Sequence, residues 1–200
     1  MLSRSLLVFS ILVSLCSLKA QDVTFRHLAV EDGLSQNTIN CIFQDHYGFM
    51  WFGTQDGLNC YDGLEFTTYR SVPEDSGTIS HNWIWDIIED TSENLWIATW
   101  NGLTKYDRSL RAFRRFLPDS SDSRSISGTR PASLDRDSKG QIWIGVWGGG
   151  LNVLNPATGT FSRYRKAEDP GQNYPGDFVR KLYIDREGTV WIGTWNGLWR

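Results

Sequence analysis

The chain has 200 residues, of which 22% are charged, and a formal net charge of −3. No cluster of Lys and Arg stands out, so the composition argues against a nucleic-acid-binding protein. The 10 Trp, 10 Phe and 19 Gly residues are typical of many short strands joined by tight turns. We therefore expect an all-β domain.

Residues 1–20 have the features of a secretory signal peptide. Arg4 supplies a positive charge, residues 6–15 form an apolar run, and Ala20 is a small residue before the expected cleavage point. The run is shorter than the roughly 20 residues that cross a bilayer as a helix. The sequence predicts a periplasmic or extracellular protein after cleavage near Ala20.

One motif recurs four times in the remaining sequence. Each copy contains a Trp that an Asp precedes by six residues and that a Gly-Leu pair follows, and successive Trp residues are 45, 47 and 48 positions apart. The Trp residues are Trp51, Trp96, Trp143 and Trp191, and the Asp residues are Asp45, Asp90, Asp137 and Asp185. Each copy reads as four short strands, A to D, and such a unit at this period is typical of a β-propeller blade.

The register divides the chain into successive blades. We expect an outer strand without a blade of its own at residues 21–29, then blade 1 at 30–75, blade 2 at 76–122, blade 3 at 123–170 and a truncated blade 4 at 171–200. Blade 4 stops inside its third strand, and a closed propeller needs more blades than these. We therefore expect about four antiparallel blades in an open arc. The remaining blades of a longer chain would be their partner. In the alternative, the strand at residues 21–29 completes blade 4 and the four blades close on themselves.

The repeated Trp and Asp residues are interpreted as architecture. The Trp of strand B supplies bulk between blades, and the Gly two residues later allows close approach. Each Asp opens the turn between strands A and B. Because the four Asp residues stand in different blades, they cannot share an ion, and the sequence predicts neither a metal site nor a cofactor.

A second set of Trp residues is the candidate binding site. In a four-stranded blade the loop between strands B and C lies at the same end as the loop that enters strand A. The residues predicted at this end are Trp100, Asn101, Trp147, Trp195, Asn196, Asn82 and Trp83. Trp rings stack on sugar rings and amides bind hydroxyls, so an oligosaccharide is the expected ligand. In the alternative, these Trp residues cap the blade packing and touch no ligand.

The motif also resembles a known family. Residues 33–37 (GLSQN), 45–54 (DHYGFMWFGT) and 57–63 (GLNCYDG) are similar to the two-component regulator propeller repeat. The resemblance implies the periplasmic sensor region of a hybrid histidine kinase, or of a protein with a diguanylate cyclase output. It also implies attachment to the membrane only through a segment downstream of this sequence.

The sequence gives little support for a catalytic function. The three His residues (His27, His46 and His81) form no pattern with a nucleophile and an acid. We therefore predict no catalytic residues and two alternative functions. The first is an extracytoplasmic sensor of a two-component system that responds to a glycan fragment. The second is a secreted propeller that binds glycans or proteins without signalling.

Overall fold

The structure is a computed structural model that describes residues 23–165 and 176–200. The predicted signal peptide lies outside these residues. Apart from one 3-10 turn, η1 (Val30–Asp32), the described elements are all β-strands. No helix in these two ranges is long and apolar enough to cross a membrane.

The strands form four antiparallel sheets, each in chain order. Blade 1 has β1 (Ile39–Gln44), β2 (Met50–Thr54), β3 (Leu58–Tyr61) and β4 (Phe66–Tyr69). Blade 2 has β5 (Ile84–Glu89), β6 (Leu95–Thr99), β7 (Gly102–Asp107) and β8 (Ala112–Phe116). Blade 3 has β9 (Pro131–Arg136), β10 (Ile142–Val146), β11 (Gly150–Asn155) and β12 (Thr160–Tyr164). Blade 4 has β13 (Val179–Ile184), β14 (Val190–Thr194) and β15 (Gly197–Trp199). The predicted all-β propeller architecture is confirmed.

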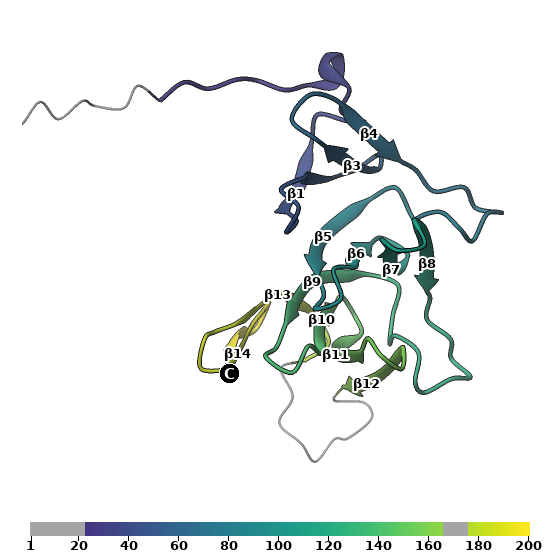
Figure 1. Ribbon diagram of the computed structural model, residues 1–200. Coiled ribbons are helices and arrows are strands. Elements are labelled where there is room, and N and C mark those ends of the chain that lie inside the picture. The colour runs from purple at the N-terminus through teal and green to yellow at the C-terminus, as the bar shows by residue number, and fades with distance from the viewer. Residues whose placement is uncertain (1–22, 166–175) are drawn as a thin grey trace, which may run out of the picture.

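The four sheets follow one another along an arc, with blade 1 at one end and blade 4 at the other (Figure 1). The first strands of consecutive blades pack together, β1 against β5, β5 against β9, and β9 against β13. This arrangement places the beginnings of the four A strands near one another. It therefore brings residues from different repeats together at one end of the molecule.

The expected outer strand at residues 21–29 does not form within the described part, residues 23–29. Phe25 is 94% exposed, and the segment extends away from the sheets (Figure 1). The turn η1 holds the following residues beside blade 1, where Gly33 lies against Phe66 of β4. The three-stranded sheet of blade 4 is at the other end of the arc (Figure 1), so the segment does not complete that sheet.

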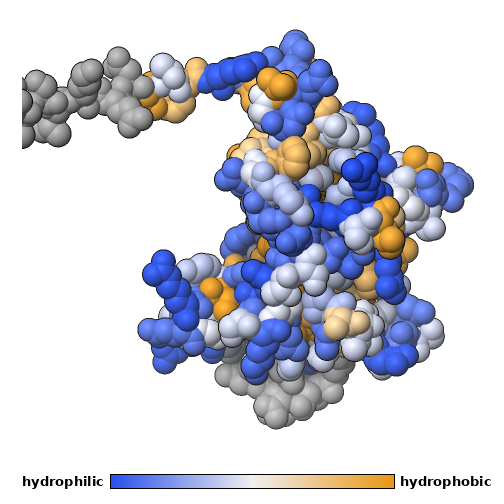
Figure 2. All heavy atoms as spheres, viewed as in Figure 1, coloured by the Kyte–Doolittle hydropathy of each residue, from blue (hydrophilic) through white to orange (hydrophobic). Residues whose placement is uncertain are grey.

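The hydrophobic core consists of three layers, one between each pair of neighbouring blades. The first is built around Trp51, Ile84 and Ile97, the second around Trp96, Leu134 and Ile144, and the third around Leu151, Val179 and Ile192. On the face seen in Figure 2, hydrophilic residues dominate and hydrophobic ones appear in small separate groups. Burial between blades therefore provides the main apolar contribution to stability.

Close approach of the blades depends on a small residue two positions after the strand-B Trp. A Cβ added at Gly53 would lie 2.6 Å from Ile84 Cγ2 and 2.5 Å from Cys41 Sγ. At Gly145, an added Cβ would lie 2.4 Å from Val179 Cγ1. Blade interfaces are thus packed too tightly at these positions for a larger side chain.

The six-residue spacing between Asp and Trp has a physical cause. In every blade the indole Nε1–H of the strand-B Trp donates to the Asp carboxylate. The other carboxylate oxygen accepts from the backbone N–H four residues after the Asp. The indole bonds are Trp51 to Asp45 (2.7 Å), Trp96 to Asp90 (2.8 Å), Trp143 to Asp137 (3.0 Å) and Trp191 to Asp185 (2.8 Å). The Asp thus fastens the turn to the ring and satisfies an indole donor that burial would otherwise leave unpaired.

Candidate functional site: an aromatic pocket at the rim

A pocket of about 360 Å³ opens at the end of the molecule where the A strands begin and the B strands end. We call this end the rim and the cavity the rim pocket. It is lined by Trp83, Trp85, Trp100, Arg130, Ala132, Trp147 and Arg180. Residues from blades 2, 3 and 4 therefore meet in one concave site, mostly apolar and with two cationic groups.

Blade 2 supplies three Trp rings to the pocket. The centroids of Trp83 and Trp100 are 5.3 Å apart, and those of Trp85 and Trp100 are 5.9 Å apart in a stacked arrangement. The Trp100 backbone N–H donates to the Trp83 carbonyl oxygen at 2.9 Å. This bond joins the loop after β6 to the segment before β5, so the ring positions are fixed by the sheet ends.

Blades 3 and 4 supply a second aromatic group beside the first. The Trp147 ring lies 5.4 Å from Trp195 in a T-shaped contact and 6.2 Å from Phe178. Trp147 lines the pocket. Trp195 is 63% exposed and lies outside the pocket, in contact with Trp147. The aromatic surface therefore extends from the pocket onto the outside of blade 4.

A β-bulge sets the orientation of one side chain in each A strand. The pairing of strands A and B skips one residue per blade: Asn40 in β1, Trp85 in β5, Ala132 in β9 and Arg180 in β13. A bulged residue is unpaired and its side chain is redirected relative to the simple alternation. In blades 2, 3 and 4 the bulged residue lines the rim pocket.

Two arginines complete the pocket wall. The Arg130 guanidinium carbon lies 4.4 Å from the centroid of the Trp100 ring. That of Arg180 lies 5.3 Å from Trp147 and 5.8 Å from Trp195. Both are cation–π contacts, which hold the planar cation against a ring and leave its N–H edges open.

Four of the seven predicted site residues gather here and three lie elsewhere. Trp83, Trp100 and Trp147 line the pocket, and Trp195 adjoins it. The Asn82 amide accepts from the Ser71 backbone N–H at 2.7 Å and donates to Asp56, so it ties loops together. Asn101 and Asn196 are exposed outside the pocket.

The sequence analysis missed four pocket residues, Trp85, Arg130, Ala132 and Arg180. Strict alternation within a strand gives no sign of a bulge, so the orientation of Trp85 and Arg180 was not predicted. The register of the repeat could have predicted the position of Arg130. Arg130 stands directly before its A strand, as Trp83 and Phe178 do.

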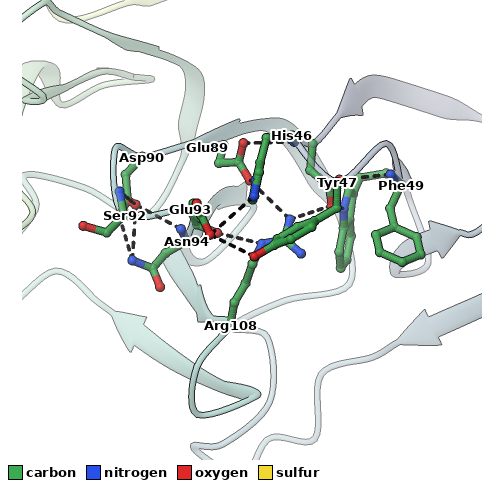
Figure 3. A network of polar contacts seen from close by, with 11 residues as sticks. His46, Tyr47, Phe49, Glu89, Asp90, Ser92, Glu93, Asn94 and Arg108 are labelled. Carbon is green, nitrogen blue, oxygen red and sulfur yellow. Dashed lines mark hydrogen bonds and ion pairs between the residues drawn. The ribbon is translucent and has the colours of Figure 1, made fainter.

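The opposite end of the blades is polar and internally paired. Arg108, in the loop after β7, donates to the Asp45 carboxylate of blade 1 and to the Glu93 carbonyl oxygen. Its guanidinium lies 5.2 Å from the Tyr47 ring, and His46 Nδ1 lies 2.9 Å from Glu89. Figure 3 shows this network between the turns of blades 1 and 2.

The network changes the acidity of Asp45. Burial raises the pKa of this carboxyl, but the hydrogen bonds from Trp51 and Arg108, together with the charge of Arg108, outweigh that effect and hold the pKa below its ordinary value. Asp45 is therefore an ionised group in a buried clamp between blades. Among the described residues, no group of three or more His, Cys, Asp or Glu side chains could hold a metal ion.

Comparison with known sequences identifies the repeat. The two-component regulator propeller profile matches residues 33–56, 78–101 and 173–196. These segments contain the GLS-type opening, the Asp turn and the strand-B Trp of blades 1 and 2, and the last two of these features in blade 4. The chain carries two-component regulator propeller repeats. The third blade, in which strand A begins at Pro131, lies outside the matched segments.

Relatives of these two-component regulator propeller repeats are parts of large signalling proteins. Histidine kinase P4 of Formosa agariphila is 47% identical over 78 residues, which are 38% of this chain and 6% of that protein. The extracellular domain assigned to the hybrid two-component system BT3049 of B. thetaiotaomicron has 27% identity and a TM-score of 0.72, covering 86% of this chain and 30% of that one.

A second solved structure agrees with the first. The extracellular domain assigned to the one-component system BT4673 of B. thetaiotaomicron has 25% identity and a TM-score of 0.70, covering 87% of this chain and 25% of that one. This chain therefore spans less than a third of each of these relatives. It resembles one section of their extracellular propellers.

Proposed function

We propose that this chain is the ligand-binding part of an extracytoplasmic sensor in a two-component signalling protein, and that the rim pocket binds an oligosaccharide. The observation that carries the binding proposal is the convergence of four Trp residues, Trp83, Trp85, Trp100 and Trp147, on one cavity. They come from two blades and their rings wall a concave space rather than a packed interface.

The pocket has the size and chemistry of a small-ligand site. Its volume of about 360 Å³ is within the common range of roughly 300–1,000 Å³ for such sites. Aromatic faces suit the apolar faces of sugar rings, and the indole and guanidinium N–H groups suit their oxygens. The four Trp side chains are half-buried, so they are held in place while part of each ring stays accessible.

The signalling part of the proposal rests on the relatives. Histidine kinase P4 contains closely similar repeats, and the two solved relatives are extracellular domains of signalling systems. The predicted signal peptide at residues 1–20 agrees with a site outside the cytoplasm. In this arrangement, a glycan bound at the rim would change how the blades are held together and so bias the output.

The test is binding of a glycan panel to the purified chain, followed by calorimetric titration of each glycan that binds. The double substitution Trp100→Ala and Trp147→Ala should weaken binding by at least about 100-fold, since each stacked ring contributes a large apolar contact. A matched control is Phe49→Ala with Tyr183→Ala, which removes two exposed rings, 38% and 61% exposed, near the opposite end.

Two results would contradict the proposal. One is a chain that folds, by its circular dichroism spectrum, and binds no glycan in the panel. The other is a bound glycan whose affinity survives the substitution of Trp100 and Trp147, or falls equally in the control variant. Signalling is tested in a longer protein that contains these repeats: the same substitutions should abolish its response to the glycan and leave its abundance unchanged.

A further inference from the structure

The two arginines of the rim pocket differ from other arginines of the fold in what they bind. Arg115 of β8 donates to the Thr78 and Val72 carbonyl oxygens at 2.9 and 2.8 Å. Arg163, at the equivalent place in β12, donates to Ser125 and Asp122 carbonyls. Their donors are used to hold the connecting loops, so these residues are structural.

The guanidinium groups of Arg130 and Arg180 make no hydrogen bond or ion pair with any residue in the described ranges, although the Arg130 carbonyl oxygen accepts from the Trp147 backbone N–H at 2.8 Å. Each guanidinium group lies over a Trp ring. The guanidinium carbon of Arg130 is 4.4 Å from the Trp100 ring centroid, and that of Arg180 is 5.3 Å from the Trp147 ring centroid. Both residues are exposed, and the pocket lining contains no Asp or Glu. Two positive charges therefore line one cavity with no acidic side chain among its described lining residues.

The placement of these charges follows the repeat. Arg130 occupies the position before strand A that is Trp83 in blade 2 and Phe178 in blade 4. Arg180 occupies the bulge position that is Trp85 in blade 2. Cations and aromatic rings thus share equivalent positions around the cavity, so one ligand can contact both kinds of group.

From this juxtaposition we propose that the ligand of the rim pocket is an acidic oligosaccharide, one whose sugars carry carboxylate or sulfate groups. The proposal rests on the proposed function and narrows it. Sugar rings stack on the Trp faces while Arg130 and Arg180 pair with the anionic substituents, which suit the planar donor edge of a guanidinium. The Trp contacts hold each cation with its N–H edges free.

The experiment uses glycan pairs that differ only in charge. Tetragalacturonate is compared with its methyl ester, and a sulfated carrageenan tetrasaccharide with its desulfated form, each titrated into the full chain by calorimetry. Both pairs accompany an array that holds carboxylated, sulfated and neutral glycans. The charged glycans that bind should do so at least about tenfold more tightly than their neutral forms, and added salt should narrow the difference. Which pair binds distinguishes a carboxylate from a sulfate.

Variants assign the effect to the two arginines. Arg130→Gln with Arg180→Gln should remove the difference between charged and neutral forms and leave weak stacking-dependent binding. The matched control, Arg136→Gln with Arg186→Gln, also removes two exposed charges from blades 3 and 4, but at the opposite end. It should keep the difference. Thermal melting of each variant checks that the fold is retained.

Each other outcome overturns a defined claim. Binding of neutral glycans alone, or equal affinity for both members of each pair, overturns the acidic ligand and leaves the rim pocket as a sugar site. Charged glycans whose affinity is unchanged by Arg130→Gln with Arg180→Gln also overturn it. No glycan binding of any kind overturns the proposed function together with this inference.

Discussion

Two Trp residues of blade 2, four positions apart, show how one residue type serves two purposes in the same repeat. Trp96 is 0% exposed, lies in the layer between blades 2 and 3, and donates to Asp90 at 2.8 Å. Trp100 follows the end of β6, is half-buried, and contacts Trp83, Trp85 and Arg130 at the rim.

The difference comes from where each residue stands relative to its strand. A ring inside strand B must face a neighbouring blade, so the fold itself provides its partner. A residue past the strand end has no such partner, and its neighbours are other rim side chains. Within this chain the strand position is Trp in all four blades, while the rim position is Gln55 in blade 1. The fold therefore requires the first ring and tolerates loss of the second.

The largest expected effect tests this difference directly. Trp96→Ala should lower the free energy of unfolding by about 3–5 kcal/mol, because it leaves a cavity between blades and removes the indole hydrogen bond to Asp90. Trp100→Ala should cost about 1 kcal/mol, since only part of that ring is buried. Urea unfolding followed by circular dichroism measures both. Equal losses in the two variants would show that the rim ring is also part of the core.

A smaller effect is expected at the clamp between blades 1 and 2. Asp45→Asn should cost about 2–4 kcal/mol, because the carboxylate is buried and binds both Trp51 and Arg108. Asp137→Asn is the matched control, since Asp137 binds Trp143 and no arginine. It should cost about 1 kcal/mol. If both substitutions cost the same, Arg108 contributes nothing to the joint between blades.

The next effect concerns the spacing between blades. Gly53→Ala should cost about 1–3 kcal/mol, because the added Cβ would lie 2.6 Å from Ile84 Cγ2. At the equivalent position in blade 4, Gly193→Ala meets its nearest atom at 3.6 Å and should be neutral within about 0.5 kcal/mol. Thermal melting compares the two. A destabilising Gly193→Ala would point to backbone conformation rather than crowding as the cause.

The residues that pack between blades could be predicted from the sequence, whereas those at the rim could be predicted only in part. Four copies of Asp, Trp and Gly-Leu at a regular period fix the blade, because each copy must bury both faces of its sheet. The sequence did not reveal why the Asp is six residues before the Trp. The structure supplies that reason in the bond from each indole to its carboxylate.

At the rim, register counting placed Trp83, Trp100, Trp147 and Trp195 at one end, and the structure brings them together. It could not place Trp85 and Arg180, because a bulge depends on how two strands pair and not on local alternation. Spacing alone also does not show the needs of the loops: Asn82, predicted at the site, binds Ser71 and Asp56.

The smallest expected change is the contribution of Asp45, in the clamp between blades 1 and 2, to the pH dependence of stability. The folded-state pKa of Asp45 is lowered from its ordinary value of 3.8, so the folded chain binds this proton less readily than the unfolded chain. The stability that this carboxylate contributes is therefore present above about pH 4 and is lost as the pH falls through the folded-state pKa. Urea midpoints measured from pH 7 to pH 3 should show the loss, and Asp45→Asn should lose less over the same range. The rim pocket has no Asp or Glu in its lining, so we expect this effect of acid at the joint between blades 1 and 2. An equal pH dependence in the parent chain and in Asp45→Asn would assign the acid sensitivity to other carboxyls.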